Sequence, residues 1–278
     1  REHREAEAAR RGLELAMERF VVAESQTFRQ ILHTLHDLAN SEVRCLLIRG
    51  ARCTGKKALA SYRHAISSRR GRPLLSLGCH VKGRRPFDET LFGIEMAGTE
   101  DTRTRIRGLL ELADGGTLVF DGIAHLPIQD QAQLQHVIET GHLRRTGSGR
   151  KIPTDVRIVA ITDLDLEPLA QQGRFDKALL RHLEAATVKL PPLREHPEDI
   201  LPLARHFLET LAPRFDIEFT GFSAEAENAL ATYSWPGNVC ELRHVVERAM
   251  IMGSEPLIGA QMLRLGPPGG PPSADDQS

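Results

Sequence analysis

The sequence predicts an α/β fold class, a parallel sheet flanked by helices, followed by a small all-helical domain. Up to about residue 190, short apolar runs alternate with helical patterns, which is typical of parallel strands joined by crossover helices. From about Arg194 onwards the pattern is helical only. A glycine-containing loop directly follows the first apolar run, as in folds that bind phosphate groups at a strand–loop–helix junction.

Composition narrows the function classes. The 278 residues are 41% hydrophobic and 26% charged, which is enough for one large domain and a smaller one. Aromatic residues make up 5%, which argues against a nucleic-acid surface of stacked rings, and the net charge of −1 gives no reason to bind DNA or a membrane. With no long apolar run and no signal-peptide pattern, we expect a cytoplasmic protein without a membrane partner. The four scattered cysteines predict reduced thiols rather than a disulfide framework or a zinc site.

The elements can be placed in chain order. A charged helix over residues 1–20 is interpreted as a linker, and the α/β domain covers residues 21–193. A helical domain at 194–265 follows, and then a flexible Pro/Gly linker at 266–278. Helix starts are predicted at Pro197–Asp199, at Ser223 and at Asn238, the last two as capping residues. Five strands are predicted, at Cys45–Ile48, Pro73–Leu77, Thr117–Phe120, Arg157–Ile161 and Ala186–Leu190.

The run Gly50-Ala-Arg-Cys-Thr-Gly55-Lys56 fits the phosphate-loop pattern G-x-x-x-x-G-K. It stands between an apolar run and a helical pattern, so that backbone N–H groups at a helix start would point at phosphate oxygens. Lys57 occupies the position where a Ser or Thr usually follows the lysine. ATP or ADP is the expected ligand, bound by Gly50, Thr54, Gly55, Lys56, Lys57 and Asp121.

Asp121 ends the apolar run Gly115–Asp121, as the carboxylate of a Mg²⁺-supporting strand does. We therefore predict Asp121 as the metal-binding residue and Mg²⁺ as a cofactor. Hydrolytic versions of this strand carry a Glu next, which orients or deprotonates the attacking water. Gly122 stands there instead, so no catalytic residue is predicted.

Five further segments match one family in order and spacing. The chain resembles, over roughly Val21 to Gly266, the central AAA+ domain of NtrC-type bacterial enhancer-binding proteins, the sigma-54 interaction domain. The resemblance implies an AAA+ α/β domain with a helical lid, and nucleotide bound between subunits of a homo-oligomer, from a dimer to a ring. It also implies RNA polymerase as a partner, and DNA binding through a helix-turn-helix that this chain does not contain. The segments are Leu91–Gly93, Ala113–Leu118, Asp155–Ile158, Leu190–Glu195 and Trp235–Val239.

The chain departs from the family pattern at positions that carry its activity. Ala97–Thr102 replaces the GAFTGA loop that touches sigma-54, and two arginines that reach a neighbour's γ-phosphate become Asp176 and His182. The sensor residue is Asp163, and the lid arginine is Cys240. Together with Gly122, these replacements imply a degenerate member of the family.

The expected function is regulation by oligomerisation, with weak ATP or ADP binding, without efficient hydrolysis and independently of sigma-54. One alternative is a slow ATPase, in which Arg174 or Arg181 serves as the arginine finger and Asp163 or Glu111 orients water. Another is a sensor of a different nucleotide, such as a cyclic dinucleotide, with Arg19 and Arg49 near the cleft. Cys53 and Cys240 are interpreted as small-residue substitutions near the nucleotide rather than as a redox or metal pair.

Overall fold

The computed structural model describes residues 24–39, 41–80, 86–96, 105–215, 218–253 and 255–266. The predicted linker helix at 1–20, the segment Ala97–Thr102 and residues 267–278 lie outside the described residues. The chain forms two compact units, which are considered separately. The sheet unit contains Thr34–Arg49 and Lys56–Lys189, and the lid unit contains Val21–His33, Gly50–Gly55 and Leu190–Ser278.

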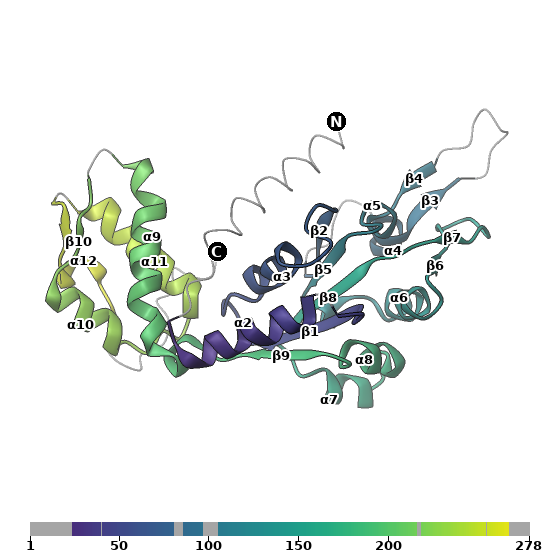
Figure 1. The fold of residues 1–278 in the computed structure, drawn as a ribbon, viewed down its shortest axis with the longest axis horizontal. Helices are drawn as coiled ribbons and strands as arrows, with labels where there is room; N and C mark the ends of the chain where they lie inside the picture. Colours follow the sequence, from purple (N-terminus) through teal and green to yellow (C-terminus); the bar gives the residue numbers. More distant parts are fainter. Residues whose placement is uncertain are drawn as a thin grey trace. The chain divides into compact units, whose positions relative to one another are not determined.

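A five-stranded sheet with the order β2-β5-β8-β1-β9 forms the centre of the sheet unit (Figure 1). Parallel pairs join β2 to β5, β5 to β8 and β8 to β1, with Leu118 opposite Ile158 and Leu47 opposite Ala160. All five predicted strands are present, and the predicted fold class is confirmed. The strands are β1 (Cys45–Gly50), β2 (Leu74–Gly78), β5 (Thr117–Asp121), β8 (Arg157–Thr162) and β9 (Thr187–Leu190).

Helices cover both faces of this sheet. Alternate residues of each strand point to opposite faces, so each strand contributes side chains to both layers. On one face, Leu47, Phe120 and Ala160 belong to a buried cluster that includes leucines of α5, α6, α7 and α8. The other face is contacted by α3, which packs on β5 and β8. Because both faces are covered, the strands read as continuous apolar runs. The helices of this unit are α3 (Lys56–Ala65), α4 (Phe87–Phe92), α5 (Leu109–Leu112), α6 (Ile128–Thr140), α7 (Leu166–Gln171) and α8 (Lys177–Leu183), whereas α2 (Gln26–Ala39) has its first half in the lid unit and its second half in the sheet unit.

Two short hairpins lie beside the main sheet. β3 (Gly93–Glu95) pairs antiparallel with β4 (Arg105–Arg107), and β6 (His142–Leu143) pairs with β7 (Ile152–Pro153). The backbone of Thr146 joins the two hairpins, because its N–H donates to Gly93 and its carbonyl accepts from Glu95.

Arg145 lies at the same junction and is almost buried. Its guanidinium donates two hydrogen bonds to the carboxylate of Glu111, both at 2.7 Å, and a third at 3.4 Å to Glu95. The hydrogen bonds from Glu111 raise the pKa of Arg145 above its ordinary value, against the opposing effect of burial. A planar, two-pronged pair of this kind fixes orientation as well as distance.

The lid unit is mainly helical. Its core contains Trp235, which is fully buried and donates from Nε1 to the carbonyl oxygen of Leu230 at 2.9 Å. In this unit α11 packs on α9 and α12, and α10 packs on α9 and α12. Its elements are η2 (Leu193–Glu195), η3 (Pro197–Asp199), α9 (Ile200–Leu211), η4 (Ala212–Arg214), β10 (Gly221–Phe222), α10 (Ala224–Thr232), α11 (Asn238–Met252), β11 (Leu257–Ile258) and α12 (Ala260–Leu263).

All three predicted helix starts are confirmed, since α11 begins at Asn238. Pro197–Asp199 leads into α9, and the hydroxyl of Ser223 accepts from the N–H of Ala226 as the cap of α10. The capping role predicted for Asn238 is wrong, since Gly237 is the residue before α11 and no side chain caps the helix. The Asn238 amide instead accepts from the N–H of Leu193 and donates to the carbonyl of Arg52.

A buried carboxylate, Asp199, ties the start of α2 to η3 within the lid unit. It accepts from the backbone N–H groups of Glu24 and Ser25, from the Ser25 hydroxyl at 2.6 Å and from Nδ1 of His196 at 2.9 Å. Burial alone would raise the pKa of Asp199, but the hydrogen bonds from Ser25, Glu24 and His196 outweigh it and lower that pKa below its ordinary value. The charged form of Asp199 therefore stabilises the fold.

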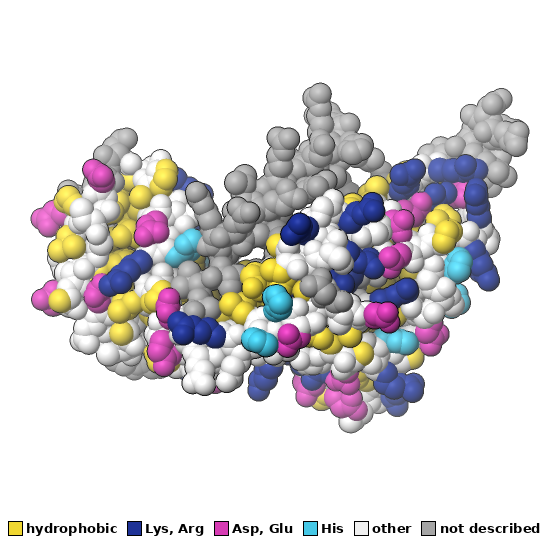
Figure 2. All heavy atoms as spheres, in the orientation of Figure 1, with side chains coloured by type: hydrophobic (Ala, Val, Ile, Leu, Met, Phe, Trp, Pro, Cys, Tyr) yellow, Lys and Arg dark blue, Asp and Glu magenta, His cyan; other side chains and the backbone are white. Residues whose placement is uncertain are grey.

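No helix within the described ranges is long and apolar enough to cross a bilayer. On the face drawn in Figure 2, acidic and basic side chains are interspersed over the sheet unit rather than separated into patches of one sign. This distribution agrees with a net charge of −1.

Candidate functional site

The predicted phosphate loop joins β1, which ends at Gly50, to α3, which begins at Lys56. The loop therefore leads into the N-terminus of a helix, the geometry that presents backbone N–H groups to an anion. Gly50 is required by close packing, because a Cβ there would lie 2.7 Å from the carbonyl oxygen of Leu190. Thr54 closes the loop on itself, since its hydroxyl donates to the carbonyl oxygen of Ala51 at 3.0 Å.

The loop is fastened to the start of α11 by three bonds in the lid unit. The N–H of Val239 donates to the carbonyl oxygen of Cys53 at 3.0 Å, and Nδ2 of Asn238 donates to that of Arg52 at 3.0 Å. The third is a disulfide between Cys53 and Cys240, whose Cα atoms are 5.5 Å apart. The position that the family fills with a lid arginine is thus covalently joined to the phosphate loop.

This disulfide corrects two expectations, reduced thiols throughout and small-residue substitution at Cys53 and Cys240. The expectations failed because the two residues are 187 positions apart, so spacing along the chain carried no signal of their proximity. The other two cysteines, Cys45 and Cys79, are free and buried. Burial raises the pKa of the Cys45 thiol to about 11 and that of Cys79 to about 12.

In the sheet unit, Lys56 is buried and opens α3. Lys57 follows it and extends to the end of β5, where its Nζ lies 2.7 Å from Oδ2 of Asp121. The Lys57 side chain is 67% exposed and that of Asp121 is 23% exposed. These two predicted site residues are therefore brought together, in contact with each other.

The predicted Mg²⁺ does not fit these residues. The Asp121 carboxylate already has a cation, the Lys57 ammonium, at hydrogen-bond distance. The hydroxyl that would supply a second protein ligand is replaced by Lys57 itself.

Gly122 stands at the position where hydrolytic versions of this strand carry a glutamate, and its surroundings differ accordingly. Gly122 has φ of 78°, in the left-handed region that favours glycine, and it begins the turn into η1 (Ile123–His125). A Cβ at Gly122 would lie 2.1 Å from Nε2 of His80. The His80 ring packs against that of His125 with centroids 4.4 Å apart. No pattern in the sequence indicated this contact, because His80 follows β2 and Gly122 follows β5, far later in the chain.

The two positions of the missing arginines also have other contacts. Asp176 caps α8, since its Oδ1 accepts from the N–H of Leu179 at 2.7 Å. His182 lies 3.5 Å from the carboxylate of Glu139. Arg174 and Arg181, their proposed substitutes, are both exposed.

Three of the residues considered for the alternative functions lie in the sheet unit. Asp163 is exposed, whereas Glu111 is held by Arg145 and is not available to orient water. The Arg49 guanidinium is paired with Glu184 and lies 3.8 Å from Asp165. Arg19 is outside the described residues.

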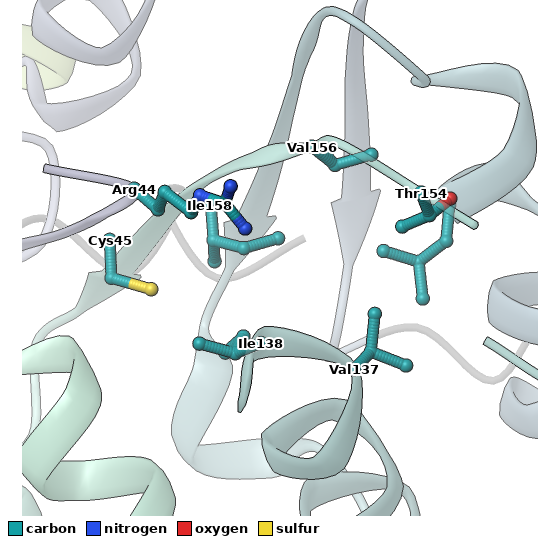
Figure 3. Close-up of a pocket in the computed structure, with 8 residues that line it drawn as sticks. Arg44, Cys45, Val137, Ile138, Thr154, Val156 and Ile158 are labelled. Atoms are coloured by element: carbon teal, nitrogen blue, oxygen red, sulfur yellow. The ribbon is translucent and has the colours of Figure 1, made fainter. Parts of the chain in front are cut away.

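A small pocket in the sheet unit does not belong to this site (Figure 3). Its volume of about 10 Å³ has room for about one water molecule. It is lined by residues before or at the start of strands, such as Arg44, Cys45 and Val156, together with Val137 and Ile138 of α6. In parallel sheets ligands bind beyond the carboxyl ends of the strands, where Asp121 lies, so this pocket is a packing gap.

Comparison with known proteins places the fold and the loop in one family. The sequence model of the sigma-54 interaction domain family matches residues 21–189. The sequence model of the AAA+ ATPase lid domain family matches residues 194–276. The chain belongs to the sigma-54 interaction domain family. The resemblance to NtrC-type proteins, based on Leu91–Gly93 and the other segments, is thereby confirmed.

Curated relatives of this sigma-54 interaction domain are regulators by name. The Psp operon transcriptional activator of Escherichia coli is 37% identical over 231 residues, which is 83% of this chain and 71% of that protein. The Sigma54-dependent transcriptional regulator SfnR of Pseudomonas fluorescens is 36% identical over 244 residues, or 88% of this chain and 66% of that protein.

Solved structures of NtrX from Brucella abortus in complex with ADP and with ATP each have a TM-score of 0.79 and 30% identity. They match 93% of this chain, which spans 59% and 60% of the two NtrX chains.

Proposed function

We propose that this sigma-54 interaction domain is a nucleotide-binding regulatory module of a DNA-binding transcription regulator that lacks efficient ATP hydrolysis. It binds ATP or ADP weakly through Gly50, Thr54, Gly55 and Lys56, with Lys57 and Asp121 at the strand end. Nucleotide acts on the assembly of the chain into a homo-oligomer, from a dimer to a ring. The helix-turn-helix and the signal-receiving part belong to the remainder of the regulator.

One observation supports the loss of hydrolysis most directly: a glycine in the left-handed conformation stands at the place of the water-orienting glutamate, with the His80 ring beside it. Gly122 adopts φ of 78°, and the space next to it is taken by the His80 ring. A general base of this kind contributes roughly 10²–10⁴ in rate. No carboxylate can be placed at Gly122 without moving His80.

The arginine positions add to the same argument. Asp176 is used as a helix cap, and an acid there repels a γ-phosphate rather than stabilising it. An arginine finger contributes roughly 10³–10⁵ in turnover. The two losses overlap rather than multiply, but either one makes turnover negligible.

Binding is expected to be more robust than turnover. The loop has the strand–loop–helix setting that presents N–H groups to phosphate, and Lys56 stands at the start of α3. NtrX, with the same fold, has been solved with ADP and with ATP. The absent lid arginine and the acid at Asp176 weaken binding without abolishing it.

Independence from sigma-54 is proposed from the sequence alone. Ala97–Thr102 carries two acids where the family has an apolar Phe-Thr tip, so the same contact with sigma-54 would be lost. RNA polymerase stays a proposed partner of the full regulator, as the family resemblance implies. In an ATP-dependent promoter-opening assay with sigma-54 holoenzyme, the full regulator should give no open complex; ATP-dependent opening would contradict this part.

The main test is calorimetric titration with ATP, accompanied by a phosphate-release assay. We expect binding that Lys56→Ala abolishes, and phosphate release at the level of the buffer. Lys177→Ala, a change of an exposed lysine at the start of α8, is the matched control and should bind as the parent does. Phosphate release that disappears in Lys56→Ala would instead establish a slow ATPase, and absence of binding would contradict the proposal.

A further inference from the structure

The contact between Lys57 and Asp121 is not explained by fold stability. A pair in which the lysine side chain is 67% exposed contributes little to folding, because water screens the attraction and ordering the lysine costs entropy. The start of α3 is also an unfavourable place for cations, since the positive end of the helix dipole lies there. Lys56 and Lys57 both stand in that first turn, which contains no acidic residue.

Such a concentration of positive charge is expected where an anion binds. Two lysines at a helix N-terminus, directly after a phosphate loop, add positive charge to the end of the helix where anions bind. Lys56 would meet the phosphates as the loop lysine does. Lys57 is directed instead to the carboxylate that would hold the metal ion.

The charge of Lys57 affects whether a metal ion can bind at Asp121. With Lys57 in its present contact, a divalent cation bound at Asp121 would lie within a few ångströms of the ammonium, and the two like charges would repel each other, although water at the exposed lysine screens part of this repulsion. The Ser or Thr hydroxyl that ligates the metal in hydrolytic loops is also absent. Both the charge and the missing ligand disfavour Mg²⁺.

We propose that the Lys57 ammonium takes the place of Mg²⁺ beside Asp121, so that this domain binds nucleoside polyphosphates without a divalent cation. This inference rests on the proposed nucleotide site and specifies its cofactor requirement. It also fits the expected lack of hydrolysis, because a metal-free polyphosphate has lost the ion that neutralises charge during phosphoryl transfer.

The test is calorimetric titration with ATP in two buffers, one with excess Mg²⁺ and one with EDTA. The parent chain should give dissociation constants that agree within about twofold. Lys57→Thr restores the hydroxyl and removes the charge, and it should bind at least about tenfold more tightly with Mg²⁺ than with EDTA. Lys177→Thr, at the exposed start of α8, is the matched control and should behave as the parent does.

A second variant tests whether the gain comes from Asp121. Lys57→Thr combined with Asp121→Asn should lose the preference for Mg²⁺. Tighter binding of the parent with Mg²⁺ by about tenfold would overturn the inference and leave the nucleotide site standing. A Lys57→Thr variant whose dissociation constant for ATP is the same with Mg²⁺ and with EDTA would overturn it as well. Absence of binding in both buffers, for parent and variants alike, would overturn the proposed function itself.

Discussion

Breaking the disulfide between Cys53 and Cys240 should lower the stability of the chain by several kcal/mol. The bond joins residues 187 positions apart, so it restricts a long segment of the unfolded chain. The chain-entropy estimate for a loop of this length is roughly 5 kcal/mol, at the upper end of what disulfides provide. The folded loop should keep its shape, because the hydrogen bonds from Val239 and Asn238 to the loop remain.

Urea unfolding in the presence and absence of dithiothreitol measures this effect. The matched variant is Cys53→Ser with Cys240→Ser, because serine is close to cysteine in size and cannot form a disulfide. We expect the reductant to lower the urea midpoint of the parent. The midpoint of the double variant should not change with reductant and should equal that of the reduced parent. Peptide mapping without reduction should recover the segments around Cys53 and Cys240 as one cross-linked species.

The buried thiols serve as an internal reference for this experiment. Cys45 and Cys79 are buried, and that burial raises their pKa values to about 11 and about 12, so neither forms a thiolate near neutral pH. Alkylation of the folded, reduced parent should therefore label Cys53 and Cys240 first. Equal unfolding midpoints with and without reductant, or a cross-link involving Cys45 or Cys79, would refute the argument.

Three further predictions concern the packing around the site. Asp199→Asn should cost about 2 kcal/mol at pH 7, as loss of hydrogen bonds to a charged group does. Because the folded pKa of Asp199 is lowered, its contribution is complete above the unfolded value near 3.8 and is lost as pH falls through the folded one. The difference between parent and variant in urea unfolding should therefore shrink in acid. Arg145→Ala should cost about 3 kcal/mol, since it leaves a buried carboxylate unpaired, whereas Arg105→Ala, at an exposed side chain, should change the urea midpoint little. Gly122→Ala should cost about 2 kcal/mol from the left-handed backbone and the overlap with His80; adding His80→Ala should recover only the part due to overlap.

The fold was predictable because its signals are local. Each buried strand is a continuous apolar run, and the turns between runs carry glycine or proline, so Cys45–Ile48 and Thr117–Phe120 were placed to within a residue or two. The start of α10 was equally clear, since Ser223 precedes an acidic first turn. The short strands β3, β4, β6 and β7 were not predicted, because segments of two or three residues have no measurable periodicity.

The failures at the site have one physical cause, the dependence of a side chain on distant parts of the chain. Asn238 has the residue type of a helix cap, but the Leu193 N–H and the Arg52 carbonyl compete for its amide. Lys57 stays a predicted site residue, but the sequence pattern did not indicate that its ammonium lies beside Asp121 at the end of β5. No local pattern reports such partners.

The replaced positions also constrain one another, which bears on whether hydrolysis could be recovered. Gly122→Glu alone meets the His80 ring and an unfavourable φ, and Cys240→Arg alone breaks the bond to Cys53. Lys57→Thr alone supplies a metal ligand while the water-orienting group is still missing. Because catalytic groups that act together lose nearly all activity when any one is absent, each single reversal should leave turnover close to zero. The proposed loss of hydrolysis therefore involves several positions at once, and we expect its recovery to need several changes together.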